Sequence, residues 1–521
     1  MGTAAIEGSS SWPNRTLSAD GRATIAVIGA GAAGTSFLYG LVKRMSAMPT
    51  VDPLRVVILE PQPRCGPGIA YGADTTTALL NRPISAMSVD YADPGHFRRW
   101  LGEREPVVRV KGSNEALFAP RSRFGDYLAN VFETACKDLD NLGCLVEVLT
   151  DSVDTVEPGH DGRMIVRPSR AAAFEAEKVV LCLGSVPTRD PYGLDEFPGY
   201  IAQPYPLEHQ LDRIEENADV LVLGTGLTAV DIALALGDTG RVGGLVLASR
   251  TGLLPDVRCD LSAAEGAPEL VKDTHAALSR NEQLSLRDLN ALLNAELVRR
   301  GTSLRSAVAP FLGRRTGPEL LRQRLGDPYP AAVAQRCIVG LTPLYSRLWR
   351  ALDEESKRRY SRRYRRVFSA LRSPMPPSSA RRLLALAEAN TLQLHAGIRE
   401  VRAEEGYFRA FYRDGSSRRF DAVVNATGRC IDVDSAGSGS LLVKLVQQGL
   451  ARPHALGGLD VDPATNEVLG INGPMGGLHV IGDLSSGVHF HTSSMEYAAT
   501  QANWVAEHIV STLDRSEGRL V

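Results

Sequence analysis

Two copies of one local pattern dominate the chain, each a short apolar run that ends at closely spaced glycines and continues with helical periodicity. In the first copy, the apolar run Thr24–Ile28 leads into Gly29, Gly31 and Gly34, and a second apolar run, Arg55–Leu59, follows the helical segment. An order of strand, glycine turn, helix and strand predicts one βαβ unit of a parallel sheet. Because the pattern returns in the middle of the chain, we expect an α/β protein with two such units.

The glycines of the first copy have three separate roles in a dinucleotide site. Gly29 permits the tight turn, Gly31 lets a pyrophosphate approach the backbone, and Gly34 lets the helix pack on the strand. The phosphates then lie at the positive end of the helix. Glu60 ends the next strand, where a carboxylate accepts hydrogen bonds from ribose hydroxyls and repels a 2′-phosphate. The predicted contacts of this adenine dinucleotide are Gly29, Ala30, Gly31, Ala32, Ala33, Gly34 and Glu60.

The second copy differs from the first at the end of its second strand. Asp219–Leu223 is followed by Gly224, Gly226 and Ala229, but the next apolar run ends at Arg250 instead of an acid. A guanidinium at this point suits a 2′-phosphate, which favours NADP(H) over NAD(H); the alternative is a solvated surface arginine. The predicted contacts of this second dinucleotide are Gly224, Thr225, Gly226, Leu227, Thr228 and Arg250.

Composition excludes several other classes of protein. The chain has 521 residues, with 58 Lys and Arg against 60 Asp and Glu, so no basic excess favours nucleic acid or an anionic membrane. The 7 cysteines include no Cys-x-x-Cys pair, which argues against a disulfide framework or a zinc site, and we predict no metal. Residues 1–22 lack the apolar stretch of a signal peptide and are predicted to be a flexible tail. We therefore expect a cytoplasmic protein.

The two units and three further segments resemble the two-dinucleotide-binding flavoproteins, in which an FAD domain is split around an inserted NADP domain. Leu181–Pro187 and Val423–Arg429 resemble the strand-to-crossover motifs of that superfamily. His479–Asp483 resembles its C-terminal FAD motif, whose Asp contacts the ribityl chain. The resemblance implies two Rossmann-like domains that bind FAD and NADPH, with Gly428, Gly482 and Asp483 at the flavin. The predicted domains are a tail at 1–22, an FAD domain at 23–210 and 391–521, and an NADP domain with an Arg-rich helical insert at 211–390.

In the loop region between residues 61 and 128, the blocks Gly66–Gly72, Leu79–Pro83 and Pro120–Leu128 resemble those of bacterial FAD-NAD(P)-binding proteins. The order of these blocks is also similar, more distantly, to flavin-dependent N-hydroxylating monooxygenases that act on ornithine and lysine. In those enzymes the equivalent first block contains a Gln and then a Lys, and the Lys binds the carboxylate of the substrate. Asn81 stands near the Gln position and is a catalytic candidate, whereas Ala86 stands near the Lys position, which argues against ornithine or lysine as the substrate. Met87 and Arg123 belong to the matching blocks and are candidate cofactor contacts.

Two departures from related flavoproteins narrow the class. Cys65 is followed five residues later by Ala70, so the dithiol of flavin disulfide reductases cannot form. Phe197, Gly199 and Gln203 match the fingerprint of Baeyer–Villiger-type monooxygenases except that Gln203 replaces its His. We expect Gln203 on the segment that seats the nucleotide.

The segment before the last helix supplies the titratable candidates. In the superfamily the N-terminus of this helix points at the flavin, and its dipole stabilises the anionic reduced ring. His489 and His491 are therefore catalytic candidates and Ser494 a cofactor contact, the alternative being that each His packs or caps the helix start. The Arg clusters at 298–372 are predicted to be a solvated helix face with ion pairs, or else an oligomer contact or a site for an anionic partner.

These observations predict an FAD- and NADPH-dependent monooxygenase. Reduced flavin would react with O2, and a C4a-(hydro)peroxyflavin would oxygenate a nitrogen of a small amine or amino-acid-like metabolite. Two alternatives remain open at this point: a reductase or dehydrogenase that does not oxygenate, and a non-catalytic flavin-binding protein that uses the Arg-rich helices as an interface. A homo-oligomer is also left open.

Overall fold

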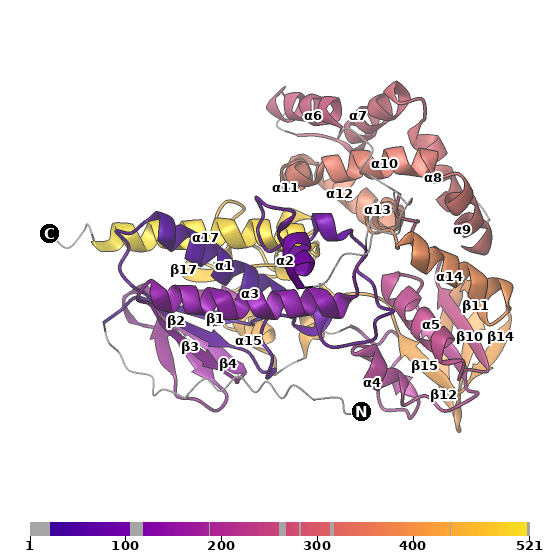
Figure 1. Ribbon diagram of the computed structural model, residues 1–521, viewed down its shortest axis with the longest axis horizontal. Coiled ribbons are helices and arrows are strands. Elements are labelled where there is room, and N and C mark those ends of the chain that lie inside the picture. Colours follow the sequence, from indigo (N-terminus) through magenta and orange to yellow (C-terminus); the bar gives the residue numbers. More distant parts are fainter. Residues whose placement is uncertain are drawn as a thin grey trace.

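The two glycine patterns lie in two separate parallel sheets in the computed structural model of the chain (Figure 1). The structure describes residues 21–104, 118–186, 188–259, 267–280, 283–312, 317–437 and 439–517. The sheets stand side by side in Figure 1, and a layer of helices covers the second sheet and reaches over the first. The predicted α/β class with two Rossmann-like units and a helical insert is confirmed.

The first sheet has the strand order β16-β17-β7-β1-β2-β3, and all its neighbours are parallel except β16 and β17. Helices α1, α3 and α17 cover one face, and the small antiparallel sheet β4-β5-β6 with α15 lies on the other. The bounds are β1 Thr24–Ile28, β2 Arg55–Leu59, β3 Leu145–Leu149, β4 Val153–Pro158, β5 Met164–Pro168, β6 Phe174–Ala176, β7 Lys178–Leu181, β16 Glu467–Gly470, β17 Gly473–Val480, α1 Ala32–Ala47, α2 His96–Arg104, α3 Arg121–Asn141, α15 Leu441–Gln447, α16 Ser486–His489 and α17 Met495–Glu517.

The core of this unit explains its sequence pattern. Every residue of β1 and β2 is buried, because both faces of the sheet are covered, and the two strands therefore read as continuous apolar runs. Phe37 and Leu41, one helical turn apart on α1, pack in the same cluster as Val505 and Ile509 of α17. The first and last helices of the chain thus lie side by side on the first sheet.

The second sheet has the strand order β11-β10-β9-β15-β8, with all neighbours parallel. Helices α4, α5 and α14 pack on one face, and the antiparallel sheet β12-β13-β14 packs on the other. The bounds are β8 Tyr200–Ile201, β9 Asp219–Leu223, β10 Gly244–Ser249, β11 Leu392–Ala396, β12 Ile398–Glu404, β13 Tyr407–Tyr412, β14 Ser417–Phe420, β15 Ala422–Asn425, α4 Leu207–Leu211, α5 Leu227–Thr239 and α14 Pro377–Glu388.

Strand pairing places more of the chain in the second unit than the sequence suggested. β8 precedes the predicted start of the NADP domain at residue 211, and β11 and β15 follow its predicted end at residue 390, yet all three pair within the second sheet. The predicted end at residue 390 is where the helical pattern of the insert stops. Which strands belong to the sheet depends instead on hydrogen bonds between strands that are distant in sequence. We therefore propose limits for the second unit near residues 200 and 425.

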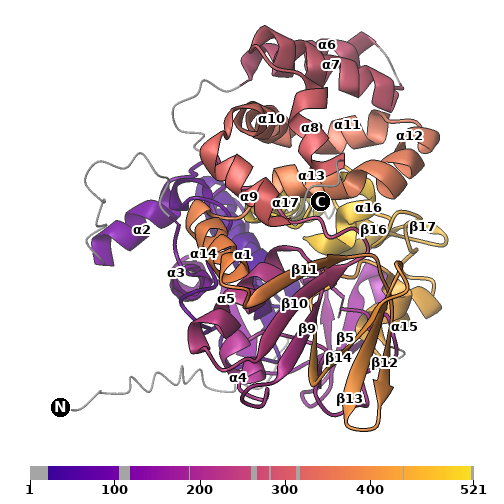
Figure 2. The ribbon, with the colours of Figure 1, turned by 90° about the vertical axis from the view of Figure 1, so that its right-hand side faces the viewer.

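The insert forms a helical layer with its own apolar cluster, seen at the top of Figures 1 and 2. Trp349 donates a hydrogen bond from Nε1 to the Gly487 carbonyl (2.8 Å) and stacks on Phe490, which docks the layer on the segment before α17. The bounds are α6 Pro268–Arg280, α7 Leu286–Arg299, α8 Leu304–Leu312, α9 Gly317–Gly326, α10 Tyr329–Gly340, α11 Tyr345–Ala351, α12 Glu354–Arg359, a π-helical turn Tyr360–Tyr364 and α13 Arg365–Arg372.

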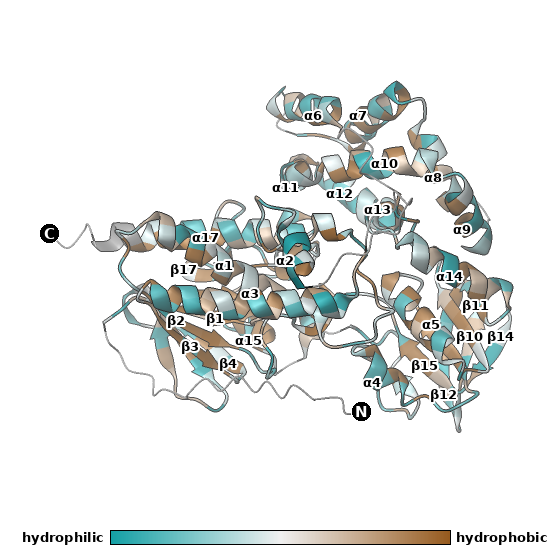
Figure 3. Cartoon of the chain, in the orientation of Figure 1, coloured by the Kyte–Doolittle hydropathy of each residue, from teal (hydrophilic) through white to brown (hydrophobic). Residues whose placement is uncertain are grey.

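The arginines of this layer do not share one environment. Arg358 and Arg359 are exposed, as expected of a solvated face, and Figure 3 shows hydrophilic stretches on these helices. Arg324 and Arg372 depart from the prediction, because each side chain is only 2% exposed. Helical periodicity identified the segment as helix, but the way in which the layer folds on itself and on the first unit buries these two guanidinium groups. Within the described part of the chain, no helix has both the length and the apolar character to span a bilayer.

The three apolar runs predicted to be strands, β1, β2 and β9, are confirmed residue for residue. Helix α1 starts at Ala32, because the glycine turn leads directly into the helix with Gly31 as its N-cap. The last helix starts at Met495, next to its predicted start.

Candidate active site

The outer glycines of the first turn are required by the fold itself. Gly29 has a φ of +98°, and a Cβ on it would lie 2.4 Å from the Cys182 carbonyl oxygen. A Cβ on Gly34 would lie 2.2 Å from the Gly29 carbonyl oxygen. Any side chain at either position would therefore displace backbone, which confirms the turn and packing roles expected of them.

The middle glycine, Gly31, is different. Its φ of −75° is open to every residue, and the nearest atom to an added Cβ is the Gly68 Cα at 3.4 Å, an ordinary contact. Neither backbone conformation nor protein packing requires a glycine here. A residue without a side chain leaves the space above the turn free, which is what a pyrophosphate lying against the backbone needs.

The second turn repeats this arrangement. Gly224 has a φ of +128°, and a Cβ on it would lie 2.2 Å from the Ala426 carbonyl oxygen, the counterpart of Cys182. Gly226 has a φ of −80°, and among the described residues nothing lies within 4 Å of an added Cβ. The repeat inferred from sequence is therefore also a repeat in three dimensions, with the middle glycine free in both copies.

Glu60 lies at the edge of the first turn, as predicted. The residue is buried, Oε2 accepts a hydrogen bond from the Ala30 N–H (2.8 Å), and Oε1 accepts one from the Gln62 N–H (3.0 Å). These bonds hold the carboxylate at the carboxyl end of β2. Each carboxylate oxygen can accept a further hydrogen bond, so the group fits a ribose diol.

Asp483 forms an ion pair with the segment that follows β15 and leads back to the first unit. Its Oδ2 lies 2.5 Å from Nη1 of Arg429, and Thr492 donates a hydrogen bond to Oδ1 (3.4 Å). Asp483 raises the pKa of the Arg429 guanidinium. Gly428 and Gly482 stand beside the pair with φ of +96° and +101°, and a Cβ on either would meet none of the described residues within 4 Å. The two distant motifs thus meet at one open site.

Some predicted cofactor contacts serve the protein instead. The Met87 side chain is buried in the cluster around Phe124, so a side-chain contact with the cofactor is wrong for Met87. The Thr225 hydroxyl donates a hydrogen bond to the Leu253 carbonyl (2.7 Å) and so fixes the loop after β10. Ser494 accepts a hydrogen bond from the Tyr497 N–H at the start of α17. The side chains of Thr225 and Ser494 thus bond backbone groups of the protein, and that of Met87 packs in an apolar cluster.

The remaining predicted contacts keep their positions at the two turns. Ala32 and Ala33 begin α1, and Leu227 and Thr228 begin α5, where the first backbone N–H groups of a helix are free to bind a phosphate. Arg123 lies in the first turn of α3 and forms an ion pair with Asp126 (3.0 Å).

His489 is a structural residue, which corrects the catalytic role predicted for it. The side chain is fully buried, Nδ1 lies 2.8 Å from the Ser346 hydroxyl, and Nε2 lies 2.7 Å from Oδ1 of Asn466. Both ring nitrogens are therefore engaged. Burial lowers the pKa of His489 to about 4, so the ring is neutral at pH 7.

We expect His489 to make the fold sensitive to mild acid. Below pH 6.5 His489 becomes protonated in the unfolded chain but stays neutral in the folded chain. The free energy of unfolding therefore falls as the pH drops from 6.5 toward 4. The expected loss at pH 5.5 is about 1.4 kcal/mol. His489→Gln should lower stability at pH 7.5 but reduce the further loss between pH 7.5 and 5.5 by that amount, as measured by urea unfolding. The matched change at exposed His160, His160→Gln, should leave the pH dependence unchanged, and the prediction fails if His489→Gln does so too.

His491 lies in the open site among positive charges. It is half-buried, and its ring contacts those of Tyr345 and Phe368. Burial, followed by the charges of Arg372 and Arg429, lowers the pKa of His491 to about 3. Of the two predicted histidines, His491 is the one near the Asp483–Arg429 pair, and it is neutral.

Gln203 follows β8 on the segment that leads to the second glycine turn. The start of this segment is held against β15, because the Gly199 carbonyl accepts a hydrogen bond from the Val423 N–H (3.0 Å). The Gln203 side chain is exposed. Just beyond it, the Tyr205 hydroxyl donates to Asp231 (2.8 Å). Asp231 also forms a buried ion pair with Arg121 of the first unit, so the segment lies where the two units meet.

Asn81 lies against an arginine that the sequence did not single out. Its carbonyl oxygen accepts hydrogen bonds from Nε (3.2 Å) and Nη2 (3.0 Å) of Arg258. Its side-chain amide makes no hydrogen bond with the described residues. Asn81 therefore remains available to a ligand.

Sequence reasoning missed several arginines at these sites. Arg250 directly follows β10, and Arg366 lies on α13. The pKa of Arg366 is lowered by burial and then by the nearby charges of Arg250 and Arg413. The exposed Arg250 is therefore one member of a group, which suits a phosphate better than a single arginine does. Arginines are frequent in the chain, and only the fold shows which of them gather.

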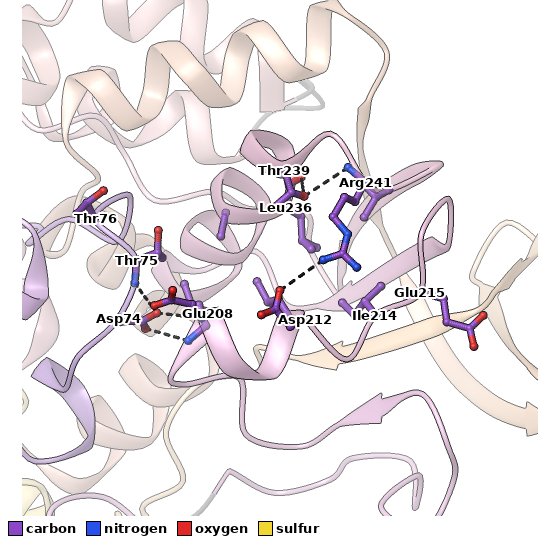
Figure 4. A pocket seen from close by; sticks show the side chains of 14 residues that line it. Asp74, Thr75, Thr76, Glu208, Asp212, Ile214, Glu215, Leu236, Thr239 and Arg241 are labelled. Atoms are coloured by element: carbon purple, nitrogen blue, oxygen red, sulfur yellow. Dashed lines mark hydrogen bonds and ion pairs between the residues drawn. The ribbon is translucent and has the colours of Figure 1, made fainter. Parts of the chain in front are cut away.

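A cavity of about 390 Å³ in the second unit lies apart from these sites (Figure 4). It is bounded by α4 and the C-terminal part of α5, whereas Gly226 caps the opposite end of α5. Asp74 at its rim accepts hydrogen bonds from the Leu207 and Glu208 N–H groups and so caps α4. We assign the cavity no part in dinucleotide binding.

Comparison with known proteins agrees with this geometry. Residues 26–186 match a family model described as FAD-NAD(P)-binding. No curated protein shows significant sequence similarity to the chain. Among solved structures, the chain is similar to the ornithine N-hydroxylase of Kutzneria sp. 744, with a TM-score of 0.59 at 16% identity over 95% of this chain and 99% of that one.

Two further structures give the same result. The L-lysine 6-monooxygenase of Pseudomonas syringae has a TM-score of 0.54 at 16% identity, covering 95% of this chain and 99% of that one. The cadaverine monooxygenase of the desferrioxamine pathway of Erwinia amylovora has a TM-score of 0.54 at 13% identity, covering 94% of both chains. At these identities the likeness is one of fold. The chain has the fold of the two-dinucleotide-binding flavoproteins, and its first unit matches the FAD-NAD(P)-binding family model.

Proposed function

We propose that the protein is an FAD- and NADPH-dependent monooxygenase that hydroxylates the nitrogen of a small amine. The balanced reaction converts amine, O2, NADPH and a proton into hydroxylamine, NADP+ and water. The observation that carries the proposal is the pair of free middle glycines, Gly31 and Gly226, in two turns built alike. FAD, when bound, would accept the hydride and activate O2.

The first site fits FAD. Glu60 would hold the adenosine ribose, the N-terminus of α1 the pyrophosphate, and Asp483 the ribityl chain. The cradle is open where the dinucleotide has to pass, because an added Cβ at Gly31, Gly428 or Gly482 meets no described residue closer than 3.4 Å. The fold analogues, named as an ornithine N-hydroxylase, an L-lysine 6-monooxygenase and a cadaverine monooxygenase, support flavin chemistry at this position.

The second site fits NADPH. Gly226 and the start of α5 would receive the pyrophosphate. Arg250, with Arg366 and Arg413 beside it, would pair with the 2′-phosphate. The Gln203 segment would seat the nicotinamide half, because it leaves the second sheet where the two units meet.

Two groups of this chain would act on the substrate. His491 is neutral, so its imidazole can accept a hydrogen bond from the amine nitrogen and help to orient it. The N-terminus of α17 follows closely in the chain, and its dipole would stabilise negative charge on the reduced cofactor. The side-chain amide of Asn81 would orient the amine.

The proposed function predicts that NADPH oxidation, O2 uptake and N-oxidised product rise together when the right amine is present. Loaded with FAD, the purified enzyme should be assayed with a panel of primary amines and amino acids, with O2 recorded by electrode and products by mass spectrometry. A product heavier by one oxygen atom, in proportion to the NADPH consumed, is expected. Hydrogen peroxide equal to the NADPH consumed for every amine would support the reductase alternative. Bound FAD without NADPH consumption would support the non-catalytic one.

A further inference from the structure

Three arginines from separate segments meet beside the candidate active site. Arg82 lies in the loop after the isolated β-bridge at Leu79, Arg258 lies in the loop after β10, and Arg372 ends α13. Arg258 and Arg372 are buried, and the Arg82 side chain is only 12% exposed. Burial lowers the pKa of Arg258 most, and the positive charges of Arg82 and Arg372 lower it further. The three guanidinium groups therefore repel one another.

The cluster carries more positive charge than its surroundings balance. Glu496 is its one carboxylate partner within the described residues, 3.1 Å from Arg82 and 4.0 Å from Arg372. Asp256, which also faces Arg258, already pairs with Arg324 (3.0 Å). Three arginines against one glutamate leave two uncompensated positive charges.

The cluster also has unused hydrogen-bond donors. Among the described residues, Nη1 of Arg82 and both Nε and Nη2 of Arg372 are buried without an acceptor. Within the described residues, the Arg258 side chain donates only to the Asn81 carbonyl. Burying charged donors without acceptors is costly, so such groups are found where a ligand completes the set.

The position of the cluster points to the substrate. The charges of Arg372 and Arg82 act on His491, and so does that of Arg429, which is bonded to Asp483 of the flavin motif. Glu496 lies in the first turn of α17. The cluster therefore borders the place where the flavin ring is expected, on the side of Asn81 and His491.

We propose that Arg82, Arg258 and Arg372 bind the acidic groups of the substrate, and that the substrate is an amine with two carboxylates. The inference rests on the proposed function. Two carboxylates match the two uncompensated charges, and guanidinium forks bind carboxylates in a bidentate manner. One carboxylate would leave a positive charge buried, and a diamine would add two more. Positive charge nearby also lowers the pKa of the substrate ammonium, which favours the free amine that attacks oxygen.

A matched pair of five-carbon probes tests the site directly. Glutarate carries two carboxylates and cadaverine two ammonium groups on the same carbon chain. Titrated into the oxidised, FAD-loaded enzyme, glutarate should perturb the flavin absorbance and raise the melting temperature, whereas cadaverine should do neither. Among amine substrates, L-aspartate or L-glutamate should stimulate NADPH oxidation more than L-ornithine, L-lysine or cadaverine.

Variants then assign the binding to the cluster. Arg372→Met should weaken glutarate binding by about ten- to a hundredfold, since a charge-assisted hydrogen bond is lost, and should leave the KM for NADPH unchanged. The melting temperature without ligand should not fall, because the change relieves repulsion between buried charges. Arg372→Lys keeps the charge and should recover part of the binding. The exposed control Arg358→Met should change neither quantity.

The outcomes separate this inference from the proposed function. Arg372-dependent glutarate binding without N-oxidation of either acidic amino acid supports the anion site and overturns the assigned reaction. N-oxidation of cadaverine, with no binding of glutarate, supports the reaction and overturns the anion site. An Arg372→Met enzyme with a raised KM for NADPH and unchanged glutarate binding assigns the cluster to the nucleotide, which also overturns the inference.

Discussion

Gly31→Val is expected to purify without FAD, whereas Gly226→Val is expected to keep FAD and lose its reduction by NADPH. Both glycines have a φ that valine adopts, and a Cβ at either position meets no atom of the described residues closer than 3.4 Å. The added side chains would instead occupy the space of a pyrophosphate, and we expect at least about a hundredfold loss of affinity, or about 2.7 kcal/mol. Flavin absorbance of the purified proteins and stopped-flow reduction by NADPH measure the two effects.

The outer glycines provide the contrast for this experiment. Gly29→Val and Gly224→Val would place a Cβ 2.4 Å and 2.2 Å from backbone carbonyl oxygens, so both variants should fold poorly. Circular dichroism should show Gly31→Val and Gly226→Val folded like the parent protein. A yellow Gly31→Val protein with the parent's flavin content would contradict the assignment of the first turn to FAD.

Arg250→Ala is expected to raise the KM for NADPH by about ten- to a hundredfold and to leave that for NADH nearly unchanged. The reason is the loss of a charge-assisted pair with the 2′-phosphate, which NADH does not carry. Because Arg413 lies close enough to act on Arg366 together with Arg250, Arg413→Ala should shift the preference in the same direction. Steady-state kinetics with both nucleotides give the two ratios.

A matched surface change completes this test. Arg399 is exposed on β12, and Arg399→Ala should leave both KM values unchanged. If Arg250→Ala raised the KM for NADPH and the KM for NADH by the same factor, Arg250 would hold the loop after β10 and would not bind the 2′-phosphate.

The candidate site could be predicted from sequence wherever a function depends on local backbone geometry. The three roles of Gly29, Gly31 and Gly34 follow from their spacing after a strand. The structure shows the turn at Gly29 and the close packing at Gly34, and it leaves the space at Gly31 free for the predicted pyrophosphate. Glu60 was found by the same reasoning, because the carboxyl ends of adjacent parallel strands lie at one edge. These features need only neighbouring elements to form.

Side chains were harder to assign than turns. His489 and His491 are two residues apart, and no local signal separates them. Both ring nitrogens of His489 bond to Ser346 and Asn466, whereas His491 faces the site. Met87 likewise belongs to a block with a plausible cofactor role but points into the core. Which way a loop side chain points depends on what packs against it from distant parts of the chain.

The sequence by itself determined that this chain forms two dinucleotide-binding βαβ units, because glycine spacing and apolar runs act over a few neighbouring residues. Only the tertiary structure decided where the second unit ends, since β8 and β15 pair across more than the length of the helical insert. It also decided which arginines matter. Arg82, Arg258 and Arg372 look like any other arginine in sequence, and they become a charged cluster because three distant segments pack together and exclude the water that would otherwise screen them.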